Sequence, residues 1–429
     1  MRVKGWSTAN IIKKTTTRKI QMNGTRFDII KKGSITTVPG FYAGSSHCGL
    51  KNSDEKLDIT IIYIPDGSAC SGVFTTNSFQ AAPVVVDREI LRKKGMVKAV
   101  VINSGIANAC TGKQGMENAV NMQEIAGSTL GTARDEVMVA STGVIGKQLP
   151  MDKIEKGIRD CAQKMDPCGG EDAAAAILTT DLVKKNIAVS VPMEGGNSIT
   201  IGGIAKGSGM IEPNMATMLA FVGTDAKVDK GVLQKVLEAA NEESFNSISV
   251  DGCQSTNDTV LLMSNGKSGI EVKEKGKNYS YFFEGLLYVM KELARMIVLD
   301  GEGATKFIQI HVKGAPDYAQ AKRAALKIAN SNLFKTAIFG QDLNWGRINA
   351  ALGSAGCQFD PENVDIYIDK IKIVEKGRGT DRGEKEASGL LEERDICFTI
   401  DLKNGNGCST IWTSDLSFDY IKINALYHN

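Results

Sequence analysis

Short runs of β-branched residues alternate with amphipathic stretches along the chain, and this alternation limits the architectures that it can adopt. Runs bounded by turn residues predict strands at 58–64, 98–103, 136–140, 198–204, 217–223, 364–374 and 396–402. Apolar residues at helical spacing predict helices at 116–131, 151–165, 229–243, 283–299 and 317–330, and a charged, glycine-rich stretch predicts a loop at 376–386. Such alternation favours an α/β or mixed α+β fold built in layers.

The charge balance excludes one large class of partners. The 429 residues include 51 lysines and arginines against 49 aspartates and glutamates, a formal charge of +2 that gives no field for holding a nucleic-acid backbone. No uninterrupted apolar run approaches the roughly 18 residues of a membrane span. We therefore expect neither nucleic acid nor a membrane as a partner.

The cysteines and histidines argue against a disulfide framework and against a metal centre. The nine cysteines are odd in number and no two have C-x-x-C spacing, which favours a reducing, cytoplasmic setting. The three histidines, His47, His311 and His428, have no H-x-x-x-H spacing. We expect no metal ion.

The first 22 residues carry six basic side chains and no acid. Such a composition is typical of an organelle-targeting peptide, and equally of a solvated tail or of an upstream start codon with Met22 as the true beginning. We favour the tail or the upstream start. We therefore expect residues 1–32 to form a basic tail outside the fold, with globular sequence beginning near Gly33.

A turn-rich segment from Lys206 to Ala216 leads directly into the predicted strand that begins at Thr217. A hydroxyl at the first residue of a buried strand is held by a rigid element, which suits a nucleophile. The alternative is a structural threonine satisfied by a backbone hydrogen bond, and composition by itself favours that alternative.

Eight segments, in order, together resemble the ornithine acetyltransferase (glutamate N-acetyltransferase) family of arginine biosynthesis. The resemblance covers nearly all of the chain after residue 35. The segments are INSGIANACTG (102–112), STGVIGKQLPM (141–151), AAILTTD (175–181), AKGSGMIEPNMATML (205–219), VDGCQSTNDT (250–259), LDGEGATK (299–306), FGQDLNWGRI (339–348) and SDLSFDYIKINALYHN (414–429).

The resemblance implies a self-cleaving enzyme with an N-terminal-nucleophile-like sandwich of β-sheets flanked by helices and a smaller C-terminal α/β region. The cut would fall between Ala216 and Thr217, which gives an N-terminal fragment from residue 33 to 216 and a C-terminal fragment from 217 to 429. Thr217 would then be the nucleophile. A free α-amino group has a pKa near 7.7–8.0, so about a tenth of it is neutral at pH 7 and can act as the base.

The resemblance also implies the other residues of the site. The Thr142 hydroxyl and the Gly143 N–H would form the oxyanion hole. Lys206 would hold the substrate by its α-carboxylate, and Thr179 is the matching substrate-contacting threonine, with Thr180 as the alternative from the sequence. Taken alone, the two oxyanion-hole residues read as a plain turn and Lys206 as a surface lysine.

Three further substrate contacts are implied nearer the C-terminus. A carboxylate at Glu302 suits the side-chain ammonium of ornithine. Asn424 and the final residue, Asn429, match two C-terminal contacts, although the family usually has Ser or Thr at the last position.

The activity implied is transfer of an acetyl group from N2-acetylornithine to glutamate through an acetyl-threonine intermediate, without a cofactor. Family members with one and with two activities share these segments, so acetyl-CoA stays open as a second donor. The implied assembly is a heterotetramer of two alpha and two beta fragments. Two rivals stay open: an N-terminal-nucleophile amidohydrolase or aminopeptidase in which water resolves the ester, and an uncleaved metabolite-binding protein.

Overall fold

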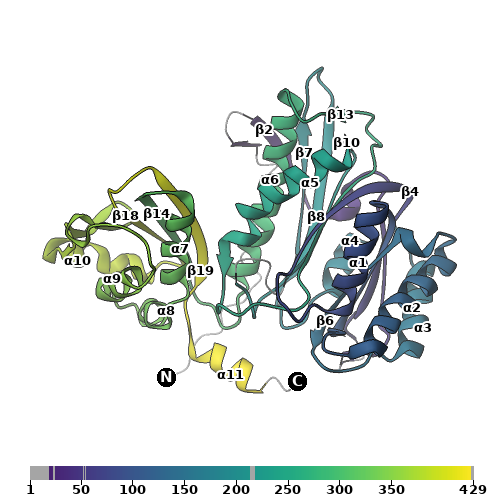
Figure 1. The fold of residues 1–429 in the computed structure, drawn as a ribbon, viewed down its shortest axis with the longest axis horizontal. Coiled ribbons are helices and arrows are strands. Elements are labelled where there is room, and N and C mark those ends of the chain that lie inside the picture. The colour runs from purple at the N-terminus through teal and green to yellow at the C-terminus, as the bar shows by residue number, and fades with distance from the viewer. Residues whose placement is uncertain (1–18, 23–24, 52, 54, 213–217, 427–429) are drawn as a thin grey trace.

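A computed structural model describes residues 19–22, 25–51, 53, 55–212 and 218–426. Figure 1 shows a larger part with strands at its centre and helices on both sides, and beside it a smaller C-terminal part coloured green to yellow. The predicted layered α/β fold with a smaller C-terminal α/β region is confirmed.

The larger part is built on one continuous sheet whose strands run in the spatial order β1-β2-β7-β8-β9-β12-β4-β5-β6, with β3 paired to β4. The strands are β1 (Lys19–Met22), β2 (Thr25–Ile29), β3 (Tyr42–Ser46), β4 (Ile59–Phe74), β5 (Met96–Ile106), β6 (Val137–Val144), β7 (Lys185–Pro192), β8 (Ser198–Lys206), β9 (Leu219–Thr224) and β12 (Thr259–Ser264). β9 runs parallel to β12, and β5 runs parallel to β6.

This sheet folds back on itself, so that its two halves face each other. Neighbouring strands lie about 4.8 Å apart, so a flat sheet would separate β8 from β6, five positions away, by about 24 Å. Instead Lys206 Nζ at the end of β8 lies 3.4 Å from Thr142 Oγ1 near the end of β6. The fold occurs along β4, where the pairing register with β5 shifts between Tyr63 and Ser68.

Alternating side chains fill the space between the two halves. On β9, Leu219 and Phe221 point into a cluster that also holds Val100 of β5 and Met138 of β6, whereas Ala220 on the other face of β9 belongs to a different cluster. Period-two alternation in strands that are buried on both faces therefore gives an inner core and an outer core.

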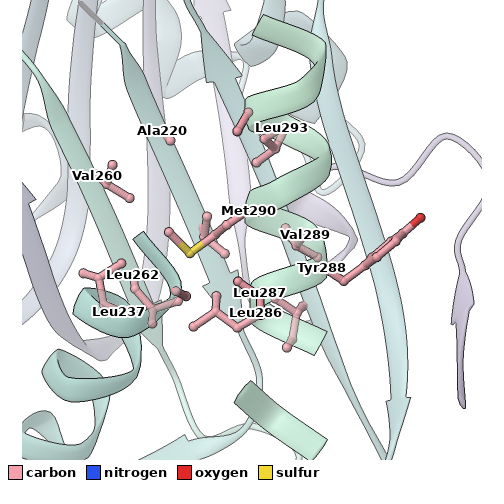
Figure 2. Packing of buried hydrophobic residues seen from close by; sticks show 14 of the residues in the cluster. Ala220, Leu237, Val260, Leu262, Leu286, Leu287, Tyr288, Val289, Met290 and Leu293 are labelled. Carbon is pink, nitrogen blue, oxygen red and sulfur yellow. The ribbon is translucent and has the colours of Figure 1, made fainter. Parts of the chain in front are cut away.

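Helices cover the outer faces. α5 (Lys230–Glu242) and α6 (Lys277–Leu299) pack on β7, β8, β9 and β12, and Figure 2 shows Leu237 of α5 and Met290 of α6 near Leu262 of β12. α2 (Gly112–Leu130) and α3 (Met151–Gln163) cover the outer face of β4, β5 and β6. α1 (Ala82–Lys93) and α4 (Gly170–Ala176) add side chains to the inner core.

The C-terminal part has its own sheet and core. Its strands run in the order β11-β19-β14-β18-β15-β16-β17. They are β11 (Ile248–Ser249), β14 (Phe307–Ala315), β15 (Asp365–Ile368), β16 (Ile371–Glu375), β17 (Arg378–Gly379), β18 (Asp395–Asp401) and β19 (Gly407–Ser414). The helices are α7 (Tyr318–Ala329), α8 (Asn332–Phe339), α9 (Trp345–Gly353), α10 (Asp381–Ala387) and α11 (Phe418–Leu426).

Short elements complete the described chain. A two-stranded parallel pair joins β10 (Lys227–Val228) to β13 (Glu271–Val272). The 3₁₀ helices are η2 (Ile35–Thr37), η3 (Arg134–Glu136), η4 (Phe245–Ser247), η5 (Pro361–Asn363) and η6 (Ser388–Glu392).

Two of the predicted elements are wrong. The predicted strand at 364–374 is a hairpin of β15 and β16, because the chain turns at Asp369, whose φ is +49°. The predicted loop at 376–386 contains β17 and most of α10, because Ala387 at the end of α10 is buried in the C-terminal core. Most of the charged residues of that stretch lie on α10, which Ala387 anchors to the core.

The predicted tail is also partly wrong, because β2 belongs to the sheet. Asp28 and Ile29 pair with Ser190 and Val189 of β7. The Phe27 ring is buried, 4.8 Å from the ring of Tyr288 on α6. The basic composition of this segment gives no sign of Phe27, whose burial joins the segment to the outer core.

Candidate functional site

Three of the predicted site residues lie outside the described residues: Ala216, Thr217 and Asn429. The described chain resumes at Met218, whose backbone N–H donates to Asp258 Oδ1 at 2.9 Å, and β9 begins at the next residue. The prediction of a strand at 217–223 is thus confirmed from Leu219 onward.

Thr142 and Gly143 lie at the C-terminal end of β6, where β6 pairs with β5. Gly143 has a φ of +128°, and a Cβ there would lie 2.3 Å from the backbone carbon of Gly105. Only glycine fits such a close approach of two strands. Thr142 is almost completely buried.

Lys206 connects two of the predicted residues. Its Nζ donates to Thr179 Oγ1 at 2.9 Å and to Thr142 Oγ1 at 3.4 Å, and its side chain is 3% exposed. Thr180 faces a different partner, since its hydroxyl bonds the Ser208 hydroxyl at 2.7 Å. The structure therefore brings Thr142, Thr179 and Lys206 together, and it places Thr179 rather than Thr180 against the lysine.

The buried carboxylate of Asp181 lies next to Lys206. Asp181 Oδ1 accepts from the Gly207 N–H at 2.7 Å, and its Oδ2 accepts from the Thr179 N–H at 3.0 Å and lies 3.9 Å from Lys206 Nζ. Burial lowers the pKa of Lys206, and the charge of Asp181 opposes that decrease.

Two more charges complete a buried cluster with Asp181. Lys185 Nζ lies 2.7 Å from Asp181 Oδ1 and 2.7 Å from Asp300 Oδ2. Burial alone would raise the pKa of Asp181, but Lys185 and Lys206 hold it well below its ordinary value. Burial raises the pKa of Asp300 in spite of Lys185. This cluster was not predicted from the sequence, although Asp181 and Asp300 lie inside the T-T-D and L-D-G-E-G segments.

The side chains of Glu302 and Asn424 are hydrogen-bonded to each other. Asn424 Nδ2 on α11 donates to Glu302 Oε2 at 2.8 Å, and the Glu302 N–H donates to the Ser208 carbonyl at 2.9 Å. A Cβ on Gly209 would lie 2.4 Å from the Glu302 carboxyl carbon. The loop after β8 therefore joins Glu302 to Lys206, and all six predicted residues that the structure describes belong to one connected region.

The region has the charge pattern of a site for a small zwitterion. Lys206 offers a buried cation beside two threonine hydroxyls, and Glu302, whose backbone N–H donates to the Ser208 carbonyl, offers a partly exposed carboxylate. A charged partner in a water-poor site forms a stronger hydrogen bond than a neutral one. A ligand with a carboxylate and an ammonium group could satisfy both.

The described residues include no group of three or more His, Cys, Asp or Glu side chains that could hold a metal ion. In the same part of the chain, no helix is long and apolar enough to cross a membrane. A cavity of about 630 Å³ lies elsewhere, between α5 and α6 on one side and β14 and β19 on the other.

Comparisons with known proteins match nearly the whole chain. The model of the ArgJ family matches residues 42–429. The arginine biosynthesis bifunctional protein ArgJ of Oceanobacillus iheyensis is 44% identical over 400 residues, 93% of this chain and 97% of the relative. The protein of that name from Symbiobacterium thermophilum is 46% identical over 397 residues, 92% of this chain and 98% of the relative.

A solved structure is also similar. The ornithine acetyltransferase of Mycobacterium tuberculosis, crystallised with ornithine, is 37% identical to this chain. The superposition covers 44% of this chain and 98% of that chain, with a TM-score of 0.41.

Proposed function

The chain belongs to the ArgJ family, and we propose that it transfers an acetyl group from N2-acetylornithine to glutamate, giving ornithine and N-acetylglutamate. The observation that carries this proposal is the buried contact of Lys206 with Thr142 and Thr179, at the end of β8 and within one loop of Glu302. It supports a carboxylate-binding cation beside the residues proposed for the oxyanion hole.

The proposed nucleophile is formed by self-cleavage. Water hydrolyses the peptide bond between Ala216 and Thr217, so that Thr217 gains a free amine. A threonine hydroxyl needs a base, and this amine supplies one without a histidine. Nucleophile and base then belong to the same residue.

In the first half-reaction, Thr217 Oγ attacks the acetyl carbonyl and its proton passes to the Thr217 amine. The Thr142 hydroxyl and the Gly143 N–H donate to the oxyanion, which can supply a few kcal/mol of stabilisation. The C–N bond breaks, the amine returns the proton, and ornithine leaves. In the second half-reaction, the α-amine of glutamate attacks the acetyl-threonine ester and gives a proton to the Thr217 amine. The C–O bond to Thr217 breaks, the Thr217 amine returns the proton to Oγ, and N-acetylglutamate leaves.

The proposed substrate contacts follow from charge. Lys206 binds the α-carboxylate with help from Thr179, and Glu302 binds the side-chain ammonium of ornithine. Asn424, which donates to Glu302, orients that carboxylate, and Asn429 supplies the last contact. No residue of this scheme requires a metal or a prosthetic group, so we propose that the enzyme works without a cofactor.

Three further features belong to the proposal. The relatives are named bifunctional, which supports acetyl-CoA as a second donor for the same threonine. The two fragments are proposed to assemble as two alpha and two beta chains. The metabolic role places the enzyme in the cytoplasm.

The test combines intact mass with turnover. We expect two fragments, residues 1–216 and a second that begins Thr-Met-Leu-Ala, and loss of acetyl from acetylornithine that depends on added glutamate. Fast loss without glutamate would instead indicate a hydrolase, and a single uncleaved chain without transfer would indicate a binding protein. Thr217→Ala should abolish cutting and transfer; retained transfer would remove this nucleophile.

A further inference from the structure

A single asparagine joins the two facing halves of the sheet at the proposed site. Asn257 stands just before β12, in the half that also holds β8 and β9. Its Nδ2 donates to the Ser141 carbonyl at 2.8 Å and to the Ala107 carbonyl at 2.6 Å, both in the opposite half. Ser141 directly precedes Thr142, so this amide holds the backbone that carries the proposed oxyanion hole.

The orientation of the Asn257 amide is fixed by a second contact. Its Oδ1 accepts from the Thr256 hydroxyl at 2.6 Å, and the side chain is buried. With the oxygen engaged in this way, both N–H groups point to the two carbonyls. The amide is therefore fully used within the described chain.

Asp258, the next residue, holds the backbone directly after the proposed nucleophile, Thr217. Asp258 is completely buried, and its Oδ1 accepts from the Met218 N–H, the peptide nitrogen bonded to the carbonyl carbon of residue 217. Burial raises the pKa of Asp258 well above its ordinary range, although the Met218 N–H, the hydroxyls of Thr75 and Ser255, and Lys206 act in the opposite direction.

The backbone between these two side chains is held as well. The Asp258 carbonyl accepts from the Thr75 N–H at 3.0 Å, and the Thr256 carbonyl accepts from the Ala81 N–H at 2.9 Å. The Thr75 hydroxyl donates to the Ser255 carbonyl at 2.7 Å. The segment 255–258 is thus fixed at both ends, so its two side chains have little freedom to move apart.

We propose that Asn257 and Asp258 form a clamp that sets the distance between the start of β9 and the end of β6. They are positioning residues, because they act on the backbone next to Thr217 and Thr142 and not on the substrate. The inference rests on the proposed acetyl transfer. A misplacement of about 1 Å between reacting groups can cost about 100-fold in rate, so the clamp should matter mainly for kcat.

The first test compares two buried amides that hold the same strand. Asn257 holds the end of β6 at Ser141, and Gln123 Nε2 donates to the Val137 carbonyl at the beginning of β6 at 3.0 Å. We expect Asn257→Ala to lower kcat about 100-fold per cleaved molecule, with KM for acetylornithine within about twofold. Gln123→Ala should leave kcat within about twofold of wild type while lowering the melting temperature.

The second test does not depend on the folding of Asn257→Ala. Asp258→Asn keeps an oxygen that can accept from the Met218 N–H, whereas Asp258→Ala removes it. We expect Asp258→Asn to keep kcat within about fivefold and Asp258→Ala to lose about 100-fold. If Asp258→Asn falls as far as Asp258→Ala while both melt cooperatively, the acceptor role is refuted.

The outcomes separate this inference from the proposed function. If wild type transfers no acetyl group, the proposed function fails, and the clamp fails with it. If wild type transfers and Asn257→Ala keeps its kcat, or loses no more than Gln123→Ala, the clamp alone is refuted. A loss of kcat in Asn257→Ala with normal KM supports it.

Discussion

Lys206 is a charged residue almost without contact with solvent, and two hydroxyls and one carboxylate compensate its burial. Such a group is expensive to bury, and it is expected where function needs it. Its neighbour Thr179 shows how much a single position matters. Adjacent threonines face different partners, and only the structure distinguishes them.

Replacing Lys206 should weaken substrate binding. We expect Lys206→Met to lower kcat/KM about 10- to 100-fold, since a hydrogen bond to a charged group contributes about 1.5–3 kcal/mol. The matched control is Lys335→Met. Lys335 is also buried, bonds the Thr413 hydroxyl at 3.0 Å, and lies in the C-terminal part. An unchanged kcat/KM in Lys206→Met would refute the proposed contact between Lys206 and the α-carboxylate of the substrate.

The same lysine predicts a pH dependence of binding. Because burial lowers its pKa, Lys206 loses its proton at a lower pH than an ordinary lysine. KM for acetylornithine should therefore rise in the wild type as pH increases through that value, and KM of Lys206→Met should stay flat over the same range. Parallel KM profiles for the two proteins would assign the change to another group.

Asp181 is predicted to stabilise the fold as well as the site. Asp181→Asn leaves Lys185 with a weaker partner, and breaking a buried pair costs about 3–5 kcal/mol. The free energy of unfolding in urea is measured in a Thr217→Ala background, where the proposed uncleaved chain unfolds as one molecule. Glu155→Gln is the control, because Glu155 and Arg159 form an exposed pair at the same spacing as Asp181 and Lys185.

The direction in which the Asp181 contribution to the free energy of unfolding changes with pH follows from the lowered pKa of Asp181. A depressed carboxyl pKa contributes stability above the ordinary value of 3.8, and this stability is lost as pH falls through the folded value. The difference between wild type and Asp181→Asn should therefore be full at neutral pH and shrink below about pH 4. A difference that stays constant down to pH 2 would contradict the charge assignment.

At the scale of elements, the residues of the proposed site lie at the ends of strands. Thr142 and Gly143 lie just before Val144, the last residue of β6; β8 ends with Lys206, and β9 begins two residues after Thr217. Strand ends combine a fixed backbone with free access for side chains, which suits a preorganised site. The close contact between β5 and β6 leaves no room for a side chain at Gly143.

Gly143→Ala should therefore disturb β6 and the reaction together. Its Cβ would collide with backbone that cannot move without opening the β5–β6 pairing, so we expect transfer to fall by more than about 100-fold. Gly143→Ala combines two causes of strain, a positive φ and a collision of the new Cβ with Gly105. Gly146→Ala has only the first, because Gly146 has a φ of +83° but open space where a Cβ would lie. We expect that control to cost about 1 kcal/mol of stability and to keep its activity.

At the scale of the whole molecule, the N-terminal segment is part of the outer core. Phe27→Ala should lower the free energy of unfolding by about 3–5 kcal/mol, because a buried aromatic ring beside Tyr288 is lost. Phe79→Ala, whose ring is largely exposed, is the control and should have little effect. Equal stability of Phe27→Ala and wild type would show that β2 contributes nothing to the fold.

The sequence by itself determined the elements and the family. Most of the predicted strands and helices are present, since the periodicity of apolar residues is a local property that each segment carries with it. The ordered segments predict the site residues, and the six that the structure describes lie in one region. Three elements were not predicted, because a single residue decides each of them. Asp369 makes the turn of the hairpin at 364–374, Ala387 anchors the helix after it, and Phe27 anchors the strand β2.

Only the tertiary structure decided how these pieces meet. The sheet folds back along β4, and this fold brings Lys206 to Thr142 and Asn257 to Ser141. The buried cluster of Asp181, Lys185 and Asp300 depends on the same packing, with 115 residues separating the last two along the chain. Such contacts depend on which faces of the two halves of the sheet come together. The burial of apolar side chains from both halves, not the pattern of any one segment, determines that arrangement.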